Sequence, residues 1–262
     1  MESKQVSDAA RLLLEARRTG TPLRELPGSC KPATAADANA IVDEVTKQLG
    51  EPVAGWKVTF LYKPREAAIR APIFSRRLFS SPAKVPVSLV PSLFIEPEIT
   101  FRLLYDLPSR AQVYRAQEVA DAVEACCSLE CVDTRFDTSH RTIRQMLNER
   151  STLVEAYADH ITNGAFVIGD AIRNWQAADF GNMRVTMRTD EKTIVESVGG
   201  HAFVDPFLPV VVLANVLRNG PGLRTGQIVA TGSFTGFFPV KVGQPITAEF
   251  EGFGQAQATF VP

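Results

Sequence analysis

The sequence predicts an α+β fold with a helical N-terminal portion and a β-rich remainder. Residues 1–50 have the apolar spacing and the capping residues of helices. The segment 79–108 is rich in Val, Leu, Phe and Pro, which is typical of short, irregular strands, and most of the last third of the chain also has strand patterns. The regular alternation of strands and helices in a doubly wound sheet is missing. We therefore expect a helical portion at residues 1–72 and a β-rich domain at residues 73–262, packed as one compact unit.

The N-terminal portion is predicted to contain two amphipathic helices. Ser7 is a suitable N-cap for the first. The second begins with a capping box formed by Thr34 and Asp37 and has apolar residues at four-residue spacing. A strand is then expected at 54–62 (AGWKVTFLY), followed by a short helix at 63–71 (KPREAAIRA) that ends before a proline.

The β-rich domain is interrupted by three segments with helical spacing. They are 117–126 (QEVADAVEAC), 151–160 (STLVEAYADH) and 205–220 (DPFLPVVVLANVLRNG). The chain ends in a predicted β-hairpin, in which ITAEF and QAQATFV are the strands and EGFG is the turn. In the β-rich domain the helices are therefore expected to alternate with strands along the chain, rather than to form one helical block.

Composition excludes several classes of function. The formal net charge of −1 and the absence of a basic stripe argue against nucleic acid or an anionic membrane as a partner. We expect neither a secretory signal nor a membrane span, because no apolar stretch is long enough. The four cysteines have neither a CxxC pair nor zinc-ligand spacing. Cys126 and Cys127 are adjacent, which disfavours a disulfide between them and favours a reducing cytoplasm. No P-loop, Rossmann fingerprint or nucleophile elbow is present.

Two glutamates occur one residue apart in the segment FIEPEITF at 94–101. In a strand, Glu96 and Glu98 share one face, roughly 6–7 Å apart, while the apolar residues point to the other. One interpretation is the solvated face of an exposed strand, which Pro97 favours because proline tolerates only an edge or a bulge. The other is a divalent metal site, since Mg²⁺ and similar ions need converging carboxylate oxygens.

A third carboxylate and a lysine lie in apolar, strand-like segments. Glu130 stands in CCSLECVD, where an unpaired carboxylate is costly to bury. It can be explained as a metal ligand or as half of a buried salt bridge with Arg135 or Arg102. Lys57 stands in GWKVTF and is either functional or an edge-strand lysine whose ammonium reaches solvent.

Seven segments in a fixed order reach from about residue 35 to the C-terminus. In this order the chain resembles the family of 2-keto-4-pentenoate hydratases and 4-oxalocrotonate decarboxylases, within the fumarylacetoacetate hydrolase superfamily. The segments are GWKV (55–58), RAPIF (70–74), IEPEITFRLLYDLP (95–108), ADAVEACCSLECVDTRF (120–136), ADHITNGAFVIG (158–169), GGHAFVDPF (199–207) and GSFTGFFPVKVGQPITAEFEGFG (232–254).

The resemblance implies a mixed β-sheet roll with a smaller helical N-terminal part, assembled as a dimer or a higher homo-oligomer. It implies that Glu96, Glu98 and Glu130 bind Mg²⁺ or Mn²⁺, and that Lys57 lies near the substrate. All-oxygen ligands agree with a hard cation. The chain departs from the family pattern at Thr59, where glycine is usual, in the segment IFSRRLF, which lacks an acidic residue, and at His160, where asparagine is usual.

The expected activity is that of a metal-dependent hydro-lyase in aromatic compound catabolism. It adds water to a 2-hydroxy-2,4-dienoate or a 2-oxo-enoate, of the 2-keto-4-pentenoate type, through a metal-chelated enolate. We assign catalytic roles to Lys57, with a lowered pKa, and to Asp159. Ser233 and Thr235 are expected to bind the substrate carboxylate. His160 is a candidate for handling water, although a structural role is favoured for it.

Other reactions and roles remain open from the sequence. The same metal site suits C–C bond hydrolysis of an acylpyruvate or decarboxylation of a vinylogous 2-oxo acid. A protein of a different class, a catalytically silent subunit that stabilises an active relative, is suggested by the altered pocket residues. The retained glutamates and the lysine argue against it. If the chain has a partner protein, we expect that partner to be a decarboxylase or a hydratase.

Overall fold

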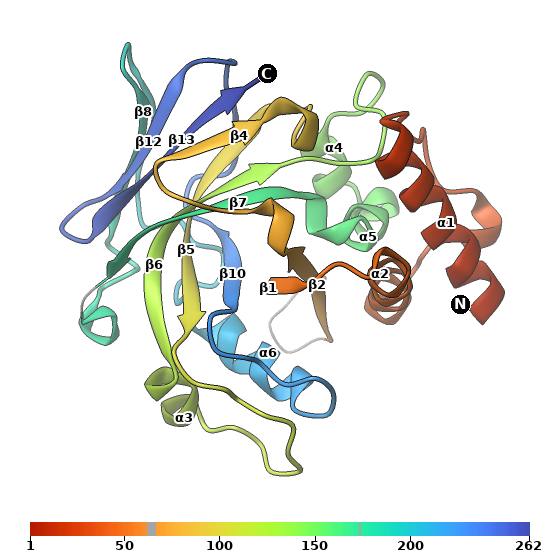
Figure 1. Cartoon of the computed structure of the whole chain (residues 1–262), viewed down its shortest axis with the longest axis horizontal. Helices are drawn as coiled ribbons and strands as arrows, with labels where there is room; N and C mark the ends of the chain where they lie inside the picture. Colours follow the sequence, from red (N-terminus) through yellow and green to blue (C-terminus); the bar gives the residue numbers. More distant parts are fainter. Residues whose placement is uncertain (62–66, 173) are drawn as a thin grey trace.

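The computed structural model describes residues 1–61, 67–172 and 174–262, and in these ranges two curled β-sheets pack with six α-helices (Figure 1). The predicted α+β class is confirmed. No helix in the described ranges is long and apolar enough to cross a membrane. The helices are α1 (Ser3–Thr19), α2 (Ala35–Leu49), α3 (Ala116–Asp121), α4 (Ile143–Asn148), α5 (Arg150–Ala158) and α6 (Leu208–Leu217).

The larger sheet has eight strands in the order β2-β1-β10-β5-β6-β7-β3, with β11 paired to β5. Its pairing is mixed, because β1 and β10 are parallel, as are β3 and β7, while β5, β6 and β7 are antiparallel neighbours. Its strands are β1 (Val53–Phe60), β2 (Ala68–Phe74), β3 (Leu78–Ser80), β5 (Phe94–Leu103), β6 (Val123–Val132), β7 (Asn163–Ile172), β10 (Ile228–Ser233) and β11 (Phe238–Pro239).

The smaller sheet has five strands in the order β4-β13-β12-β8-β9. The predicted C-terminal hairpin is confirmed, because β12 and β13 are antiparallel and the chain turns at 251–253. This sheet packs against the larger one through contacts of β13 with β6 and β7. Its strands are β4 (Ala83–Pro86), β8 (Arg184–Thr189), β9 (Thr193–Val198), β12 (Pro245–Phe250) and β13 (Gly254–Val261).

The N-terminal helices α1 and α2 pack together beside α4 and α5, at the right of Figure 1. The capping box of Thr34 and Asp37 is confirmed at the start of α2. The start predicted for α1 is wrong, because the helix begins at Ser3 with Glu2 as its N-cap. Glu2 and Gln5 form the capping box, which adds one turn before Ser7.

Two predicted helices give way to strands of the large sheet. The prediction of a helix at 63–71 lies partly outside the described residues, and residues 68–71 belong to β2, where Ile69 and Ala71 are buried. Helix 117–126 ends at Asp121, because β6 begins at Val123 and runs into the core. In both places tertiary burial outweighs helix propensity.

The division at residue 72 stays a prediction, and β1 and β2, which lie at this boundary, pair within the large sheet.

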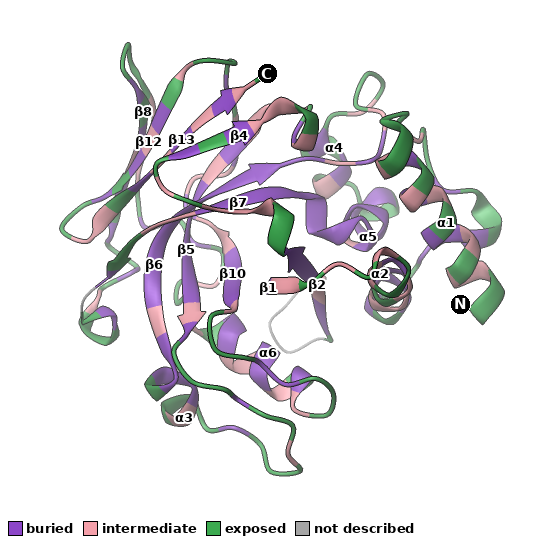
Figure 2. Cartoon of the chain, in the orientation of Figure 1, coloured by how far each residue is buried: buried purple, intermediate pink, exposed green. Residues whose placement is uncertain are grey.

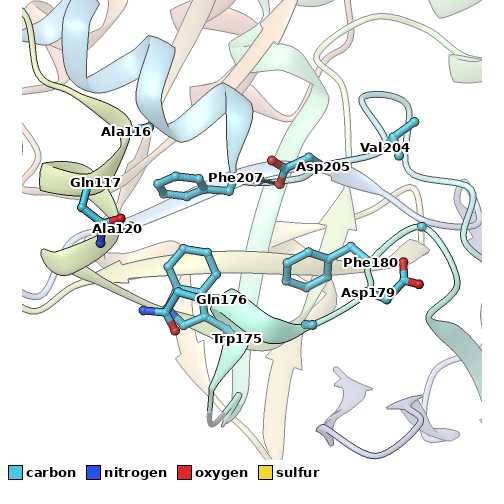
Figure 3. Close-up of a pocket in the computed structure, with 12 residues that line it drawn as sticks. Ala116, Gln117, Ala120, Trp175, Gln176, Asp179, Phe180, Val204, Asp205 and Phe207 are labelled. Atoms are coloured by element: carbon cyan, nitrogen blue, oxygen red, sulfur yellow. Dashed lines mark hydrogen bonds between the residues drawn. The ribbon is translucent and has the colours of Figure 1, made fainter.

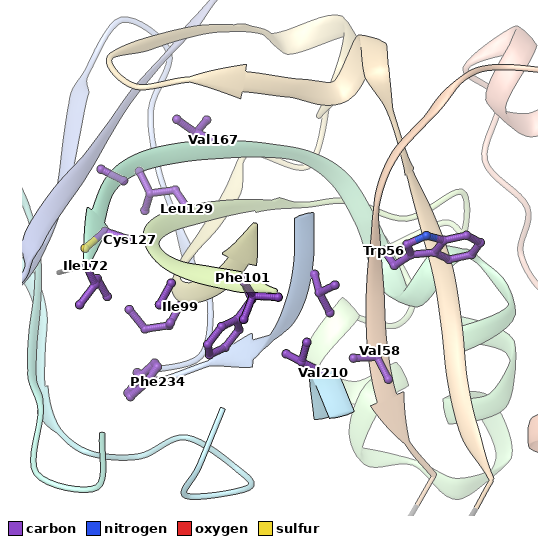
Figure 4. Close-up of a cluster of buried hydrophobic side chains, with 14 of the residues drawn as sticks. Trp56, Val58, Ile99, Phe101, Cys127, Leu129, Val167, Ile172, Val210 and Phe234 are labelled. Carbon is purple, nitrogen blue, oxygen red and sulfur yellow. The ribbon is translucent and has the colours of Figure 1, made fainter. Parts of the chain in front are cut away.

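The main hydrophobic core lies on one face of β1, β5 and β6 (Figure 4). Strand alternation places Val58, Ile99 and Leu129 on this face, each next to a polar residue that points the opposite way. The three strands are largely buried on both faces (Figure 2). Lys57, Glu98 and Glu130, on the middle of the second face, are therefore enclosed by the protein, and that face holds the predicted site.

Candidate active site

Strand register brings the three predicted metal ligands together. Glu96 on β5 is directly opposite Glu130 on β6, and Glu98 follows two residues later on the same face. One carboxylate oxygen from each of the three lies within 4.8 Å of the others. Pro97 is not on an edge strand, because β5 lies between β10 and β6, and the irregular pairing of β5 with β10 falls next to it, between Thr100 and Glu98.

The carboxylates are too deeply buried for the exposed-strand interpretation, which is wrong. Glu98 and Glu130 are 0% exposed, and β5 lies between β10 and β6. Both oxygens of Glu98 and Oε2 of Glu130 are buried without a hydrogen-bond partner in the described structure. Buried, unpaired carboxylate oxygens are costly unless a cation meets them. The donor set therefore fits a hard divalent ion.

Among the described residues, Lys57 is the one cationic residue that forms a hydrogen bond with the triad. Its Nζ donates to Glu130 Oε1 at 2.5 Å and to the backbone oxygen of Ile161 at 2.8 Å. The alternative of an edge-strand lysine is wrong, because β1 lies between β2 and β10 and Lys57 is 7% exposed. The suggested Glu130 salt bridges are also wrong, since Arg135 pairs with Asp159 and Arg102 with Glu124.

Asn163 is a site residue that the sequence analysis missed. Its side-chain amide donates to Glu130 Oε1 at 3.1 Å, so this oxygen receives hydrogen bonds from both Asn163 and Lys57. Asn163 begins β7 and is 3% exposed. The only sequence signal was its place in ADHITNGAFVIG, where a polar residue precedes a buried strand.

Crowding of buried charge shifts the pKa values of the site. Burial, and then the charge of Glu130, raise the pKa of Glu96 to about 8. Burial and both neighbouring carboxylates raise the pKa of Glu98 well above its usual range. The lowered pKa expected for Lys57 is wrong for the metal-free protein. Burial does lower it, but the charges of Glu130, Glu98 and Glu96 outweigh burial and raise the pKa of Lys57.

These shifts predict that the metal-free protein loses stability as pH rises from 6.5 to 8. In this window folded Glu96 and Glu98 still bind protons that the unfolded chain has released, so the free energy of unfolding falls with pH. The expected loss is about 2–4 kcal/mol, from ~1.4 kcal/mol per pKa unit for each group. The window excludes His160 and His201, because burial lowers both pKa values and their effect on stability lies below pH 6.5.

The measurement is urea unfolding in a chelating agent at several pH values, repeated with saturating Mn²⁺. Metal binding requires ionised carboxylates, so in saturating Mn²⁺ the folded and the unfolded chain are deprotonated alike, and the loss of stability with rising pH is expected to disappear. Equal slopes with and without metal would contradict the assignment of the shifted groups to a metal site.

Asp159 and His160 lie beside the site in a tightly bonded segment. Asp159 Oδ1 accepts from Arg135 Nε at 2.5 Å, and Oδ2 accepts from Thr134 Oγ1 and the Arg135 backbone N–H, both at 2.8 Å. His160 is buried against Phe74, and burial, then the nearby arginines, lower its pKa well below 6.5, so it is neutral. The catalytic role of Asp159 stays a prediction. Its contacts show a carboxylate already held by neighbouring groups.

Ser233 is the last residue of β10, and Thr235 lies in the turn that follows it. Ser233 is opposite Glu98 in the sheet, and it lowers the pKa of Glu96 against the larger effects of burial and of Glu130. Its Oγ also accepts from the backbone N–H groups of Thr235 and Gly236. The Thr235 hydroxyl donates to the Gly236 carbonyl at 2.9 Å. Ser233 therefore adjoins the triad, whereas Thr235 bonds within the turn, and substrate binding by either stays a prediction.

A surface cavity of about 440 Å³ lies elsewhere, between α3, the segment after β7 and the start of α6 (Figure 3). Trp175, Phe180 and Phe207 line it, and Trp175 packs against Phe101 on the core face of β5. None of the predicted site residues, all of which the structure describes, lines this cavity. It is thus separated from the glutamate triad by the sheet.

Comparison with known proteins agrees with the sequence resemblance. No family model matches the chain. A 2-keto-4-pentenoate hydratase of Paraburkholderia xenovorans is 24% identical over 99% of this chain and 96% of its own. A 4-oxalocrotonate decarboxylase of Pseudomonas putida is 24% identical over 87% and 86%, and a TodF product hydratase of Pseudomonas putida is 28% identical over 97% and 95%. The chain is a homologue of these hydratases and decarboxylases.

Solved structures of other proteins have the same fold as this chain. The 4-oxalocrotonate decarboxylase from Pseudomonas putida G7, complexed with magnesium and adipate, superimposes with a TM-score of 0.79 at 20% identity, over 99% of this chain and 98% of that one. The fumarylacetoacetate hydrolase from Exiguobacterium antarcticum gives 0.54 at 13% identity, over 80% and 76%. The predicted fumarylacetoacetate hydrolase type of fold is confirmed, and a structural neighbour binds magnesium.

Proposed function

We propose that this protein is a metal-dependent hydratase that adds water to a 2-hydroxy-2,4-dienoate or a related 2-oxo-enoate. The observation that supports it most is the triad of half-buried Glu96 with fully buried Glu98 and Glu130, in which Lys57 is hydrogen-bonded to Glu130. A protein without an active site has little reason to keep three carboxylates together when two of them are fully buried, since they repel one another. The hydratase names of the homologues support the same reaction.

The triad would hold Mg²⁺ or Mn²⁺ through carboxylate oxygens alone, as hard cations prefer. Such an ion would act as a Lewis acid for negative charge on the 2-oxygen of a 2-oxo acid. Lys57 is assigned to the same centre, because its ammonium already lies at Glu130 Oε1. Asn163 fixes Glu130 from a second direction and so limits the orientations of that carboxylate.

The chemical steps require a proton donor and a water molecule. A 2-hydroxypenta-2,4-dienoate takes up a proton at C5 as its 2-hydroxyl proton is released, and water then adds across the new double bond with its oxygen at C4. The product, 4-hydroxy-2-oxopentanoate, contains one water more than the substrate. Lys57 is protonated and donates a hydrogen bond, so it is suited to deliver or hold this proton. Ser233 is proposed to orient the substrate carboxylate from the neighbouring turn.

The test compares substrates under identical conditions with Mg²⁺ or Mn²⁺. We expect hydration of the dienoate, followed as loss of its ultraviolet absorbance, and no turnover when a chelator is present. Calorimetric titration with Mn²⁺ is expected to give one site per chain, tightened by oxalate, which mimics a chelating 2-oxo acid. Absence of Mn²⁺ binding with and without oxalate would contradict the proposal.

Decarboxylation is the second candidate, because a homologue and a solved structural neighbour are named 4-oxalocrotonate decarboxylases. The same substrate series separates it from hydration through release of carbon dioxide from a vinylogous 2-oxo diacid. Acylpyruvate cleavage is detected in parallel as pyruvate formation. We further propose that the protein is cytoplasmic and forms a homo-oligomer, alone or with a decarboxylase or hydratase partner. Light scattering of the purified protein measures the oligomeric state.

A further inference from the structure

The segment between α5 and β7 has an unusual backbone. His160, Ile161 and Thr162 have φ values of 55°, 54° and 55°, so three consecutive non-glycine residues occupy the left-handed region. This conformation costs roughly 1–2 kcal/mol per residue for L-amino acids, and most for β-branched side chains such as Ile and Thr. A strained turn persists only when its surroundings hold it, and such turns concentrate at functional sites.

The left-handed turn, defined as residues 160–162, contacts the proposed catalytic group directly. The carbonyl of Ile161 accepts from Lys57 Nζ at 2.8 Å. Asn163, the next residue, donates to Glu130 Oε1 at 3.1 Å. Both members of the Lys57–Glu130 pair are therefore bonded to this short segment. If the turn relaxed to a right-handed conformation, the Ile161 carbonyl would no longer point at the ammonium.

Arg135 binds both ends of the left-handed turn. Its Nε donates to Asp159 Oδ1 at 2.5 Å and its Nη2 to the Asp159 carbonyl at 2.8 Å. Its Nη1 donates to the carbonyl of Asn163 at 3.0 Å. The turn is thus bracketed by one guanidinium. Arg135 is 6% exposed, and among the described residues it forms no hydrogen bond or ion pair with the triad.

We propose that Arg135 is a positioning residue, which holds the left-handed turn so that the Ile161 carbonyl keeps Lys57 aligned at the triad. The inference rests on the proposed function for the importance of Lys57, but the geometry of the turn is independent of it. The fork of the guanidinium is essential here, because one group bonds a side chain and two backbone carbonyls at once. A lysine ammonium has one nitrogen and cannot span both ends.

The first test is Arg135→Lys, which keeps the charge beside Asp159 and removes the fork. We expect kcat to fall about 10- to 100-fold, while KM and the Mn²⁺ dissociation constant stay within about threefold. Arg102→Lys is the control, since Arg102 is also an arginine paired with a carboxylate, that of Glu124, but does not contact the turn. Equal losses of kcat in both variants would overturn the proposal.

A second readout does not need turnover. Lys57 is shielded from amine-reactive reagents when its ammonium is bonded, so its acetylation in metal-free protein can be followed by mass spectrometry. We expect at least tenfold faster labelling in Arg135→Lys and no change in Arg102→Lys. If the wild-type protein turns over no substrate, the proposed function fails, whereas this labelling still decides the role of Arg135. Unchanged labelling would overturn it.

Glycine in the turn separates positioning from general structural support. Glycine adopts positive φ readily, so Thr162→Gly removes the strain that drives the turn to relax. Adding Thr162→Gly to Arg135→Lys is expected to restore most of the protection of Lys57 and most of kcat. A further loss of both would contradict the proposal. If Arg135→Lys does not fold, Asp159→Asn tests the same contact, and faster Lys57 labelling that Thr162→Gly reverses is again expected.

Discussion

Glu98→Gln is expected to make the metal-free protein more stable by about 2 kcal/mol and to weaken Mn²⁺ binding at least 100-fold. Glu98 is fully buried, and neither of its oxygens has a hydrogen-bond partner in the described structure. Burial and the neighbouring carboxylates raise its pKa, so at neutral pH the folded protein must hold a proton that the unfolded chain releases. Glutamine has the same shape without this cost. It also removes the charge that the cation needs, so stability and metal affinity change in opposite directions.

Glu130→Gln is the matched variant, because it removes a second member of the same triad. It is also expected to lose Mn²⁺, but its stability should fall. Lys57 is buried with Glu130 as its ion-pair partner, and breaking a buried pair costs roughly 3–5 kcal/mol. Urea unfolding of both variants in a chelating agent, with calorimetric Mn²⁺ titration, measures the contrast. Lower stability of Glu98→Gln would mean that Glu98 has a stabilising partner, and unchanged Mn²⁺ affinity would exclude the triad as the metal site.

The sequence was sufficient for the parts of this site that depend on strand alternation. Glu96 and Glu98 were predicted to share a face from their spacing alone, and the register of β5 with β6 adds Glu130 to that face. Apolar neighbours correctly indicated that Glu130 is buried, whereas for Lys57 they left a functional site and an edge strand as alternatives. Family resemblance supplied the assignment of the three glutamates as a set, which no local pattern contains.

The remaining features depend on contacts between distant segments. The partner of Lys57 is 73 residues away, and the carbonyl of Ile161 is 104 residues away, so neither follows from local spacing. The direction of the Lys57 pKa shift was wrong because apolar neighbours in sequence suggested burial alone, whereas three carboxylates surround the ammonium in space. The left-handed turn was hidden for a different reason. Ile161 and Thr162 are poor residues for positive φ, and the conformation is imposed by Arg135 and the strands.

Lys57→Met is expected to reduce kcat by about 10²–10⁴, the range typical of a lost general acid or base. Methionine keeps much of the volume of the side chain but has no proton to hold or donate. The Mn²⁺ dissociation constant is expected to stay within about threefold, because the three carboxylates remain. The metal-free variant should be less stable, since Glu130 loses its cation, and saturating Mn²⁺ should restore the stability. Steady-state kinetics and calorimetry at saturating Mn²⁺ therefore separate chemistry from folding.

Lys31→Met is the control for removing a lysine from a largely buried glutamate. Lys31 pairs with Glu155 at 3.1 Å in the helical part of the protein, and Glu155 is 2% exposed. This variant is expected to lose stability without any loss of kcat in the folded protein. Mn²⁺ should stabilise it only as much as it stabilises the wild-type protein, so the loss of stability should remain. If Lys57→Met retained full kcat but lost Mn²⁺ affinity, Lys57 would be a residue that orients Glu130 for the metal. The proton at C5 would then have to come from another group, and Asp159 would have to be released by Arg135 to provide it.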